Sequence, residues 1–264
     1  MITLQHNPYR TFITSATPVG LYARQKWLGQ EKDRDWQAAF DNSLKSLLEG
    51  QLQDGSWGGS FHQTVKRLFG IHLTLRHPSD NIIRALDWLI NQTKYTKAKR
   101  YLTVDDLRGL PFVPGNPHFL YPGITLFLAA IFGLNNTPEI MTQYEKLSRH
   151  IIQNSSILDN HGDRNNILRA LIVHPEYSQS GATVSIVECL SKIQDNKGIW
   201  TDPTPFYQTI NALAHLNLPL ADKQLEKAFM LLSQTQNPDG TWGSTDQEWN
   251  TFLAVHAMRN KKIL

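Results

Sequence analysis

Two adjacent carboxylates are the residues of this sequence best suited to acid chemistry. Asp105 and Asp106 follow one another in the segment Thr103-Val104-Asp105-Asp106. Neighbouring carboxyl groups repel each other's charge, which favours keeping one of them protonated, and a protonated carboxylic acid can donate a proton to a substrate. Acidic pairs also commonly cap a helix or face solvent. Both interpretations of the pair, general acid and helix cap, stay open on the sequence alone.

A second polar group could bind a metal or an anion. It holds Asp159, His161 and Asp163, and His and carboxylate side chains at such short spacing can converge on a divalent metal. The same pattern is typical of a turn followed by a helix, with Asp163 as the residue that opens the helix. We favour the cap. No cofactor is expected, although a divalent metal at these three residues stays open.

A repeated motif organises the chain around these groups. The pattern Q-x-x-x-G-x-W occurs at residues 51–57, 194–200 and 236–242. Each copy is followed by a polar triplet that ends in threonine, at Thr64, Thr209 and Thr251. The last two threonines are 42 residues apart, as are the tryptophans of the last two copies. An internal repeat of this length is the signature of a repeat architecture.

The same step of 42 residues extends the repeat to the rest of the chain. Going back from Thr209 it reaches Ile167 and then Thr125, each inside an apolar run, and from Thr64 it reaches Tyr22. Thr125 and Thr64 are 61 residues apart, which indicates an insertion of about 19 residues. The sequence therefore predicts six copies, with the insertion at about residues 95–117.

Each copy predicts two helices and no strand. An amphipathic stretch precedes the Gln, as at 225–234, and a more apolar stretch follows the Trp, as at 209–216. Such helix pairs form all-α repeat proteins. We predict an all-α fold, a single (α/α)6-type toroid in which residues 1–264 form one domain with six inner and five outer helices. N-terminal residues are expected to fill the place of a sixth outer helix.

Aromatic and histidine side chains gather where the predicted inner helices begin. If they line one mouth of the ring, they form an aromatic pocket for a hydrophobic substrate, and their π-faces could stabilise a carbocation. Ordinary core packing is the alternative. These residues are Phe61, His62, His118, Phe119, Tyr121, Phe206, Tyr207 and Trp249.

The segment from Lys227 to Trp242 resembles the QW motif of squalene-hopene and oxidosqualene cyclases, [K/R]-[G/A]-x-x-[F/Y/W]-L-x-x-x-Q-x-x-x-G-x-W. Only Leu231 departs from it, standing where an aromatic residue is usual. Protein prenyltransferases belong to the same superfamily of α/α toroids. The Gln and Trp of each copy are expected to be structural, with the Gln bonding backbone groups at a helix end and the Trp packing over it.

The resemblance also implies an activity. These cyclases protonate an alkene or epoxide with a D-x-D-D cluster, and the segment that begins at Thr103 is similar to it, with Thr in place of the first Asp. It implies Asp105 as the proton donor and Asp106 as its neighbour. The implied function is that of a class-II-type terpene cyclase, which closes rings in a linear isoprenoid or a prenylated small molecule within the aromatic cavity.

Two other functions stay open. One is a non-catalytic toroid that binds a hydrophobic ligand or a protein partner in its centre. The other is a metal-dependent, prenyltransferase-like enzyme or lyase that uses Asp159, His161 and Asp163. Prenyltransferases bind zinc through Asp, Cys and His, whereas the single cysteine, Cys189, falls on a predicted outer helix. The large family cyclases join two helical domains, so a partner subunit or domain that completes the site also stays open.

Composition and charge indicate which classes of partner, nucleic acid or membrane, the chain is suited to bind. The chain has a formal net charge of +3, and its basic residues are scattered apart from a short cluster of Lys94, Lys97, Lys99 and Arg100. This pattern does not favour nucleic-acid binding. No apolar run is long enough to span a membrane, and the N-terminus lacks an apolar signal core. We expect a cytoplasmic protein, with peripheral membrane contact open because an isoprenoid substrate is a lipid.

Overall fold

The computed structural model describes residues 3–75, 77–95 and 100–264. Within these ranges the chain forms twelve α-helices and no strand, which confirms the predicted all-α class. Residues 96–99 of the predicted insertion, and with them Lys97 and Lys99 of the basic cluster, lie outside the described ranges. In these ranges no helix is both long and apolar enough to cross a membrane.

The α-helices are α1 (Pro18–Lys26), α2 (Arg34–Leu48), α3 (Phe61–Thr74), α4 (Asp80–Tyr95), α5 (Val104–Leu107), α6 (Pro117–Ile131), α7 (Pro138–Gln153), α8 (His161–Ile172), α9 (Gly181–Ile193), α10 (Phe206–Leu213), α11 (Pro219–Gln234) and α12 (Gln247–Asn260). Short 3-10 turns occur at η1 (Arg10–Phe12), η2 (Ser155–Asp159) and η3 (Tyr177–Gln179).

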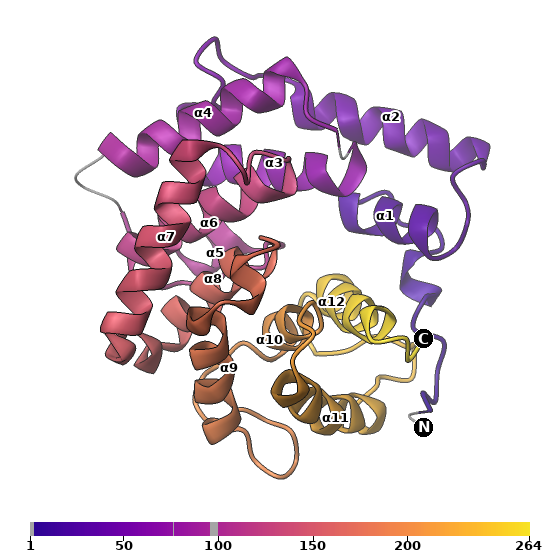
Figure 1. The fold of residues 1–264 in the computed structure, drawn as a ribbon. Helices are drawn as coiled ribbons and strands as arrows, with labels where there is room; N and C mark the ends of the chain where they lie inside the picture. Colours follow the sequence, from indigo (N-terminus) through magenta and orange to yellow (C-terminus); the bar gives the residue numbers. More distant parts are fainter. Residues whose placement is uncertain (1–2, 76, 96–99) are drawn as a thin grey trace.

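Long helices alternate between two positions along the chain. Figure 1 shows α2, α4, α7, α9 and α11 around the outside, with α1, α3, α6, α8, α10 and α12 nearer the centre. The central helices pack in chain order, α1 on α3, α3 on α6, α6 on α8, α8 on α10 and α10 on α12, and α12 packs back on α1. The contacts between central helices therefore form a closed cycle.

The repeated glutamines connect each turn to the next outer helix. Gln51 Nε2 donates hydrogen bonds to the Gly55 carbonyl in its own turn (2.9 Å) and to the Asn81 carbonyl at the start of α4 (2.8 Å). Gln194 Nε2 repeats this arrangement with the carbonyls of Gly198 (3.2 Å) and Gln224 in α11 (3.0 Å). Each glutamine thus satisfies backbone acceptors of two repeats at once, which is the structural role expected from the sequence.

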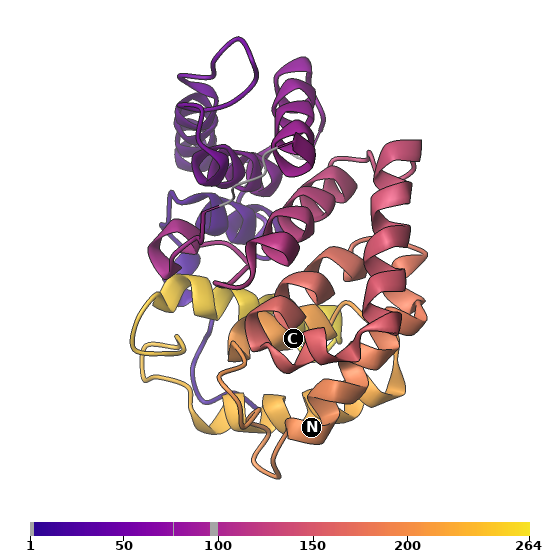
Figure 2. The ribbon, with the colours of Figure 1, turned by 90° about the vertical axis from the view of Figure 1, so that its left-hand side faces the viewer.

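The third glutamine binds the N-terminal segment instead of a helix. Gln236 Nε2 donates to the His6 carbonyl, and Gln236 Oε1 accepts from the His6 backbone N–H, both at 3.0 Å. Near the other end of the chain, Arg259 donates to the Tyr9 hydroxyl (3.1 Å). Residues before α1 therefore take, at Gln236, the contact that the other two glutamines make with an outer helix. Figures 1 and 2 show this segment running from α1 down to the side of α11.

The described part of the insertion crosses the amino ends of the central helices. Lys66 Nζ of α3 donates to the Asp105 carbonyl (2.8 Å), and Arg108 pairs with Asp246 at the start of α12 (2.9 Å). The side chains of Leu110 and Phe112 are buried. The insertion therefore lies against α3 and the start of α12.

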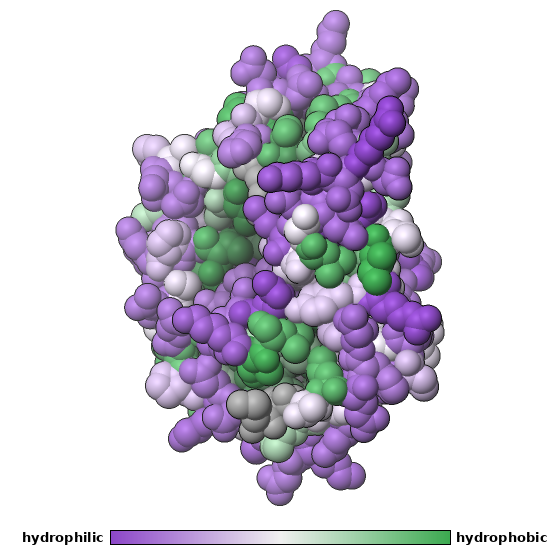
Figure 3. All heavy atoms as spheres, turned by 90° about the vertical axis from the view of Figure 1, so that its right-hand side faces the viewer, coloured by the Kyte–Doolittle hydropathy of each residue, from purple (hydrophilic) through white to green (hydrophobic). Residues whose placement is uncertain are grey.

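The outer surface is mixed rather than continuously apolar on the face shown in Figure 3. There, hydrophobic side chains lie in separate patches among hydrophilic ones, and one patch lies in a hollow. Inside, two clusters of buried hydrophobic side chains fill the space between central and outer helices.

Candidate functional site

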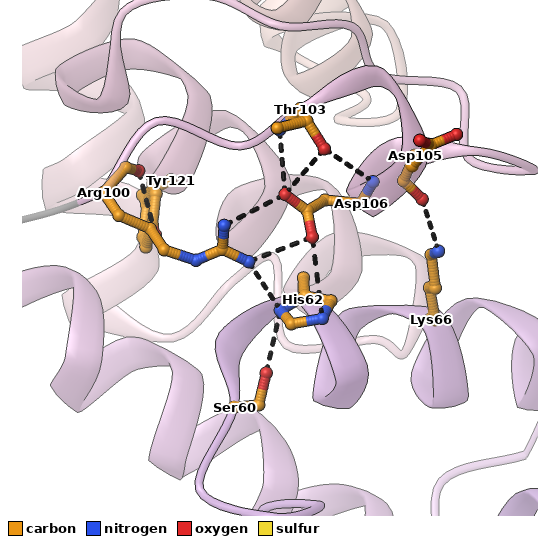
Figure 4. Close-up of polar contacts among 8 residues, drawn as sticks. All are labelled: Ser60, His62, Lys66, Arg100, Thr103, Asp105, Asp106 and Tyr121. Atoms are coloured by element: carbon orange, nitrogen blue, oxygen red, sulfur yellow. Dashed lines mark hydrogen bonds and ion pairs between the residues drawn. The ribbon is translucent and has the colours of Figure 1, made fainter.

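Asp106 is held in its charged form by its neighbours (Figure 4). Its carboxylate accepts hydrogen bonds from Arg100 Nη1 and Nη2 (both 3.0 Å) and from the Thr103 backbone N–H (2.9 Å). His62 Nε2 lies 3.7 Å away. The bonds from Arg100 and then Thr103 hold the pKa of the Asp106 carboxyl well below its usual range. At neutral pH this carboxylate is an acceptor and a charge partner.

The same contacts form a helix cap. The Thr103 hydroxyl accepts from the Asp106 backbone N–H (3.2 Å) while the Asp106 carboxylate accepts from Thr103, so the two residues make a capping box for α5. Asp105 follows the cap with 83% of its side chain exposed, and it accepts a hydrogen bond from Arg108 (2.7 Å). Of the two interpretations that the sequence left open, this geometry fits the cap.

The polar group of Asp159, His161 and Asp163 lies at the start of α8, but Asp163 is not the residue that caps this helix. Asn160 is the N-cap of α8 and accepts from the Asp163 backbone N–H (2.9 Å), so Asp163 lies three residues inside the helix that it was expected to open. The buried Asp163 carboxylate instead accepts from the Asn116 backbone N–H (2.7 Å), which ties the insertion to α8. Burial raises the pKa of Asp163, and the bond from Asn116 opposes the rise. Within the described residues, Asp159, His161 and Asp163 do not form a group that could hold a metal.

The aromatic residues at the helix beginnings do not surround one opening. Phe61 stacks on Tyr121 with ring centroids 4.1 Å apart, beside the Asp106 cluster that includes His62. Two others, His118 and Phe119, line a separate surface groove beside α4 and α7. Phe206 packs against Trp200 and Tyr207. Of the predicted set, only Trp249 lines the central cavity.

A cavity of about 200 Å³ lies among the central helices, and each of the six helices contributes to its wall. It is lined by Tyr22, Phe69, His72, Leu73, Pro111, Phe127, Ile131, Arg169, Val173, Asn211, His215, Trp249, Phe252, Leu253 and His256. Aromatic and aliphatic side chains dominate, and no carboxylate is among the described residues of the wall. Such an apolar space with a few polar groups is the usual form of a small-molecule site.

Exposure of the wall shows where the cavity opens. His215 is exposed, and Ile131 and Val173 are half-buried, all three near the carboxyl ends of central helices. By contrast, Pro111 of the insertion and Trp249 near the start of α12 are buried. The cavity therefore opens at the carboxyl ends of the central helices, at the end of the ring opposite Asp105 and Asp106.

Most of the cavity residues were missed from the sequence, although the repeat marks several of them. Phe127, Arg169, Asn211 and Leu253 are spaced by 42 residues, and all four line the cavity. Ile131, Val173 and His215 repeat the same step four residues later. Residues four apart lie on one face of a helix. Applying the 42-residue step to the middle and end of each central helix, rather than to its beginning, would have found this face.

Comparison with solved structures identifies a similar fold. A variant of the type II terpene cyclase MstE from Scytonema, without ligand, matches with a TM-score of 0.56 and 11% identity, over 98% of this chain and 89% of that one. Another MstE variant, in complex with its substrate geranylgeranyl dihydroxybenzoate, matches with a TM-score of 0.57 and 12% identity, over 100% and 91% of the two chains. No protein-family model and no curated protein matches the sequence. At these identities the resemblance to a terpene cyclase is one of fold.

Proposed function

We propose that this chain is a single (α/α)6 toroid with repeats of about 42 residues that binds a small isoprenoid-bearing molecule in its central cavity. The observation that carries the proposal is an aromatic cavity to which every central helix contributes. Its rings, among them Phe69, Phe127 and Trp249, offer apolar surface and π-faces suited to a branched, unsaturated hydrocarbon. The closed cycle of contacts between central helices supports the toroid.

The fold likeness supports the class of ligand. MstE, the terpene cyclase of similar fold, has geranylgeranyl dihydroxybenzoate as its substrate, a molecule that joins an isoprenoid chain to an aromatic acid. The cavity of this chain, about 200 Å³, is smaller than the usual range of roughly 300–1,000 Å³ for ligand sites. We therefore expect a short prenyl group to be enclosed more completely than a twenty-carbon chain.

Proton-initiated cyclisation by Asp105 is the second candidate. It is favoured by a further pocket of about 300 Å³, which the insertion and α12 line through Arg108 and Glu248. This pocket shares Phe69, Leu73 and Trp249 with the central cavity, so a movement of these three side chains would join both spaces and bring the Asp105 end into contact with a ligand. The ion pairs of both carboxylates weigh against it, because a proton donor must be protonated.

Incubation with prenylated hydroxybenzoates of increasing chain length tests both candidates. Binding is followed by tryptophan fluorescence, since Trp249 lines the cavity, and products by mass spectrometry, with Asp105→Asn in parallel. Saturable binding without conversion supports the binding function. A cyclised isomer that disappears with Asp105→Asn supports the cyclase. A lack of both binding and conversion contradicts the proposal.

A matched pair of variants locates the bound molecule. Ile131 is a half-buried wall residue of the cavity, whereas Ile152 on α7 is 62% exposed and lies away from the wall. Ile131→Trp fills part of the cavity and is expected to weaken binding at least about tenfold, while Ile152→Trp leaves it within about twofold. Equal effects of the two substitutions would place the ligand elsewhere.

A further inference from the structure

Among the residues that the structure describes, Arg169 is a buried cation without a counterion. Only 3% of the residue is exposed, and it lines the central cavity. Its Nη1 donates to Asn211 Oδ1 (2.8 Å) and its Nη2 to the Gln208 carbonyl (2.7 Å), both neutral acceptors. No hydrogen-bond acceptor lies within reach of its Nε, and among the described residues no carboxylate pairs with it. Burying a charge in this way is costly unless a partner of opposite charge is supplied.

Another arginine of α8 shows the usual solution. Arg164, five residues earlier and equally buried, pairs with the Asp202 carboxylate. It also donates to the Thr204 hydroxyl (2.6 Å) and to the Leu158 carbonyl (2.7 Å). Its Nε has no acceptor either, so the carboxylate is what distinguishes the two arginines. The fold thus supplies a carboxylate to the arginine that faces the outer layer, and supplies none to the arginine that faces the cavity.

Two buried N–H donors of the described cavity wall have no acceptor. Trp249 Nε1 is a second buried N–H without a partner, and it belongs to the same wall as the Arg169 Nε. The carboxyl ends of the central helices provide partial negative charge near the opening, which reduces the cost of the guanidinium but supplies no acceptor to its Nε. Burial lowers the pKa of Arg169 to about 9, so the side chain still carries its charge at neutral pH. A ligand that satisfies these donors must therefore supply a hydrogen-bond acceptor, and the positive charge of Arg169 favours an anionic one.

We infer that the central cavity is a carboxylate-recognition site, in which Arg169 binds the carboxylate of a monoanionic prenylated molecule. This inference rests on the proposed function. Arg169 is the one guanidinium in the described wall, and no lysine accompanies it, so one negative charge is matched while a diphosphate is not. Arg169 lies one helical turn, about 6 Å, inside the half-buried Val173. The carboxylate therefore lies near the opening, at the level of Phe127, and the hydrocarbon lies deeper, against Trp249.

Three ligands that share one hydrocarbon test the inference on the unmodified chain. Geranic acid, its primary amide and geranyl diphosphate are titrated by calorimetry at neutral pH. The acid is expected to bind at least about tenfold more tightly than the amide and than the diphosphate. Equal binding of acid and amide overturns the carboxylate site while the proposed function stands. Tighter binding of the diphosphate overturns the monoanion assignment, and no binding of any of the three contradicts the proposed function itself.

Substitution of Arg169 then assigns the preference to this side chain. Arg169→Met is expected to bind acid and amide equally, with the loss confined to the acid, and Arg169→Lys to keep part of the preference because it retains the charge. Arg164→Met is the matched control, since it removes a buried arginine from the same helix away from the cavity, and the acid preference should persist. A persistent preference in Arg169→Met overturns the inference. If that variant does not fold, the comparison of acid with amide on the unmodified chain still decides it.

Discussion

Hydrogen bonds and charge at one side chain determine what Asp106 can do. Arg100 and the Thr103 backbone both donate to its carboxylate, and both favour the charged form. The folded chain therefore releases this proton at a lower pH than the unfolded chain, whose ordinary Asp value is 3.8. The contribution of Asp106 to stability is complete above about pH 5 and is lost as the pH falls through the lowered folded pKa.

Asp106→Asn should for this reason change how the free energy of unfolding depends on pH in the acidic range. The variant is expected to be less stable than the parent at pH 7, by less than about 1 kcal/mol because the Arg100 side chain of the pair is 53% exposed and solvent screens the interaction. The difference should shrink between pH 5 and pH 3. Urea unfolding at both ends of this interval measures it. Asp105→Asn serves as the control, and an equal pH dependence of that variant would contradict the account of Asp106.

The Q-x-x-x-G-x-W turns connect neighbouring repeats at the scale of the helix pair. In the second copy, Gln194 bonds the Gln224 carbonyl of α11, and Gly198 lies against the backbone of the same helix at Lys227. Gly198 has a φ of +90°, and a Cβ built there would lie 2.6 Å from Lys227 backbone atoms. The motif therefore requires glycine for two reasons, backbone conformation and close approach of the helix.

A pair of glycine substitutions separates these two reasons. Gly133 has a φ of +85° with nothing within 4 Å of a built Cβ, so Gly133→Ala carries only the conformational cost, about 1 kcal/mol. Gly198→Ala adds a clash with α11 and is expected to cost about 2 kcal/mol more. Urea unfolding of both variants measures the difference. Similar costs would show that the close approach to α11 is relaxed without penalty.

The whole molecule is closed by residues from the two ends of the chain. The His6 carbonyl accepts a hydrogen bond from Gln236, just as the Asn81 carbonyl accepts one from Gln51 and the Gln224 carbonyl one from Gln194. Gln236→Ala should therefore speed hydrogen exchange in residues 3–13 and reduce stability by about 1–3 kcal/mol, because buried acceptors lose their donor. Gln194→Ala, the matched change inside the ring, should speed exchange in α11 instead. Unchanged exchange in residues 3–13 of the Gln236→Ala variant would contradict closure by this contact.

The sequence by itself determined the helices, their alternation and the joint between the chain ends. Thr125, Thr209 and Thr251, which multiples of 42 residues separate, are all buried in central helices. This was predictable because helical periodicity and repeat spacing are local properties of the chain. The same spacing relates the wall positions Phe127, Arg169 and Asn211, which lie in the middle or toward the end of their helices and not at the beginnings from which the pocket was predicted.

Only the tertiary structure decided which end of the ring is open and which charges are paired. The insertion carries Asp105 and Asp106, and where it lies depends on contacts with α3, α8 and α12, which are distant in sequence. Likewise, nothing near Arg164 or Arg169 in the sequence distinguishes them, since the carboxylate that pairs with Arg164 is 38 residues away. Ion pairing and burial depend on through-space distances between side chains, which spacing along the chain does not specify.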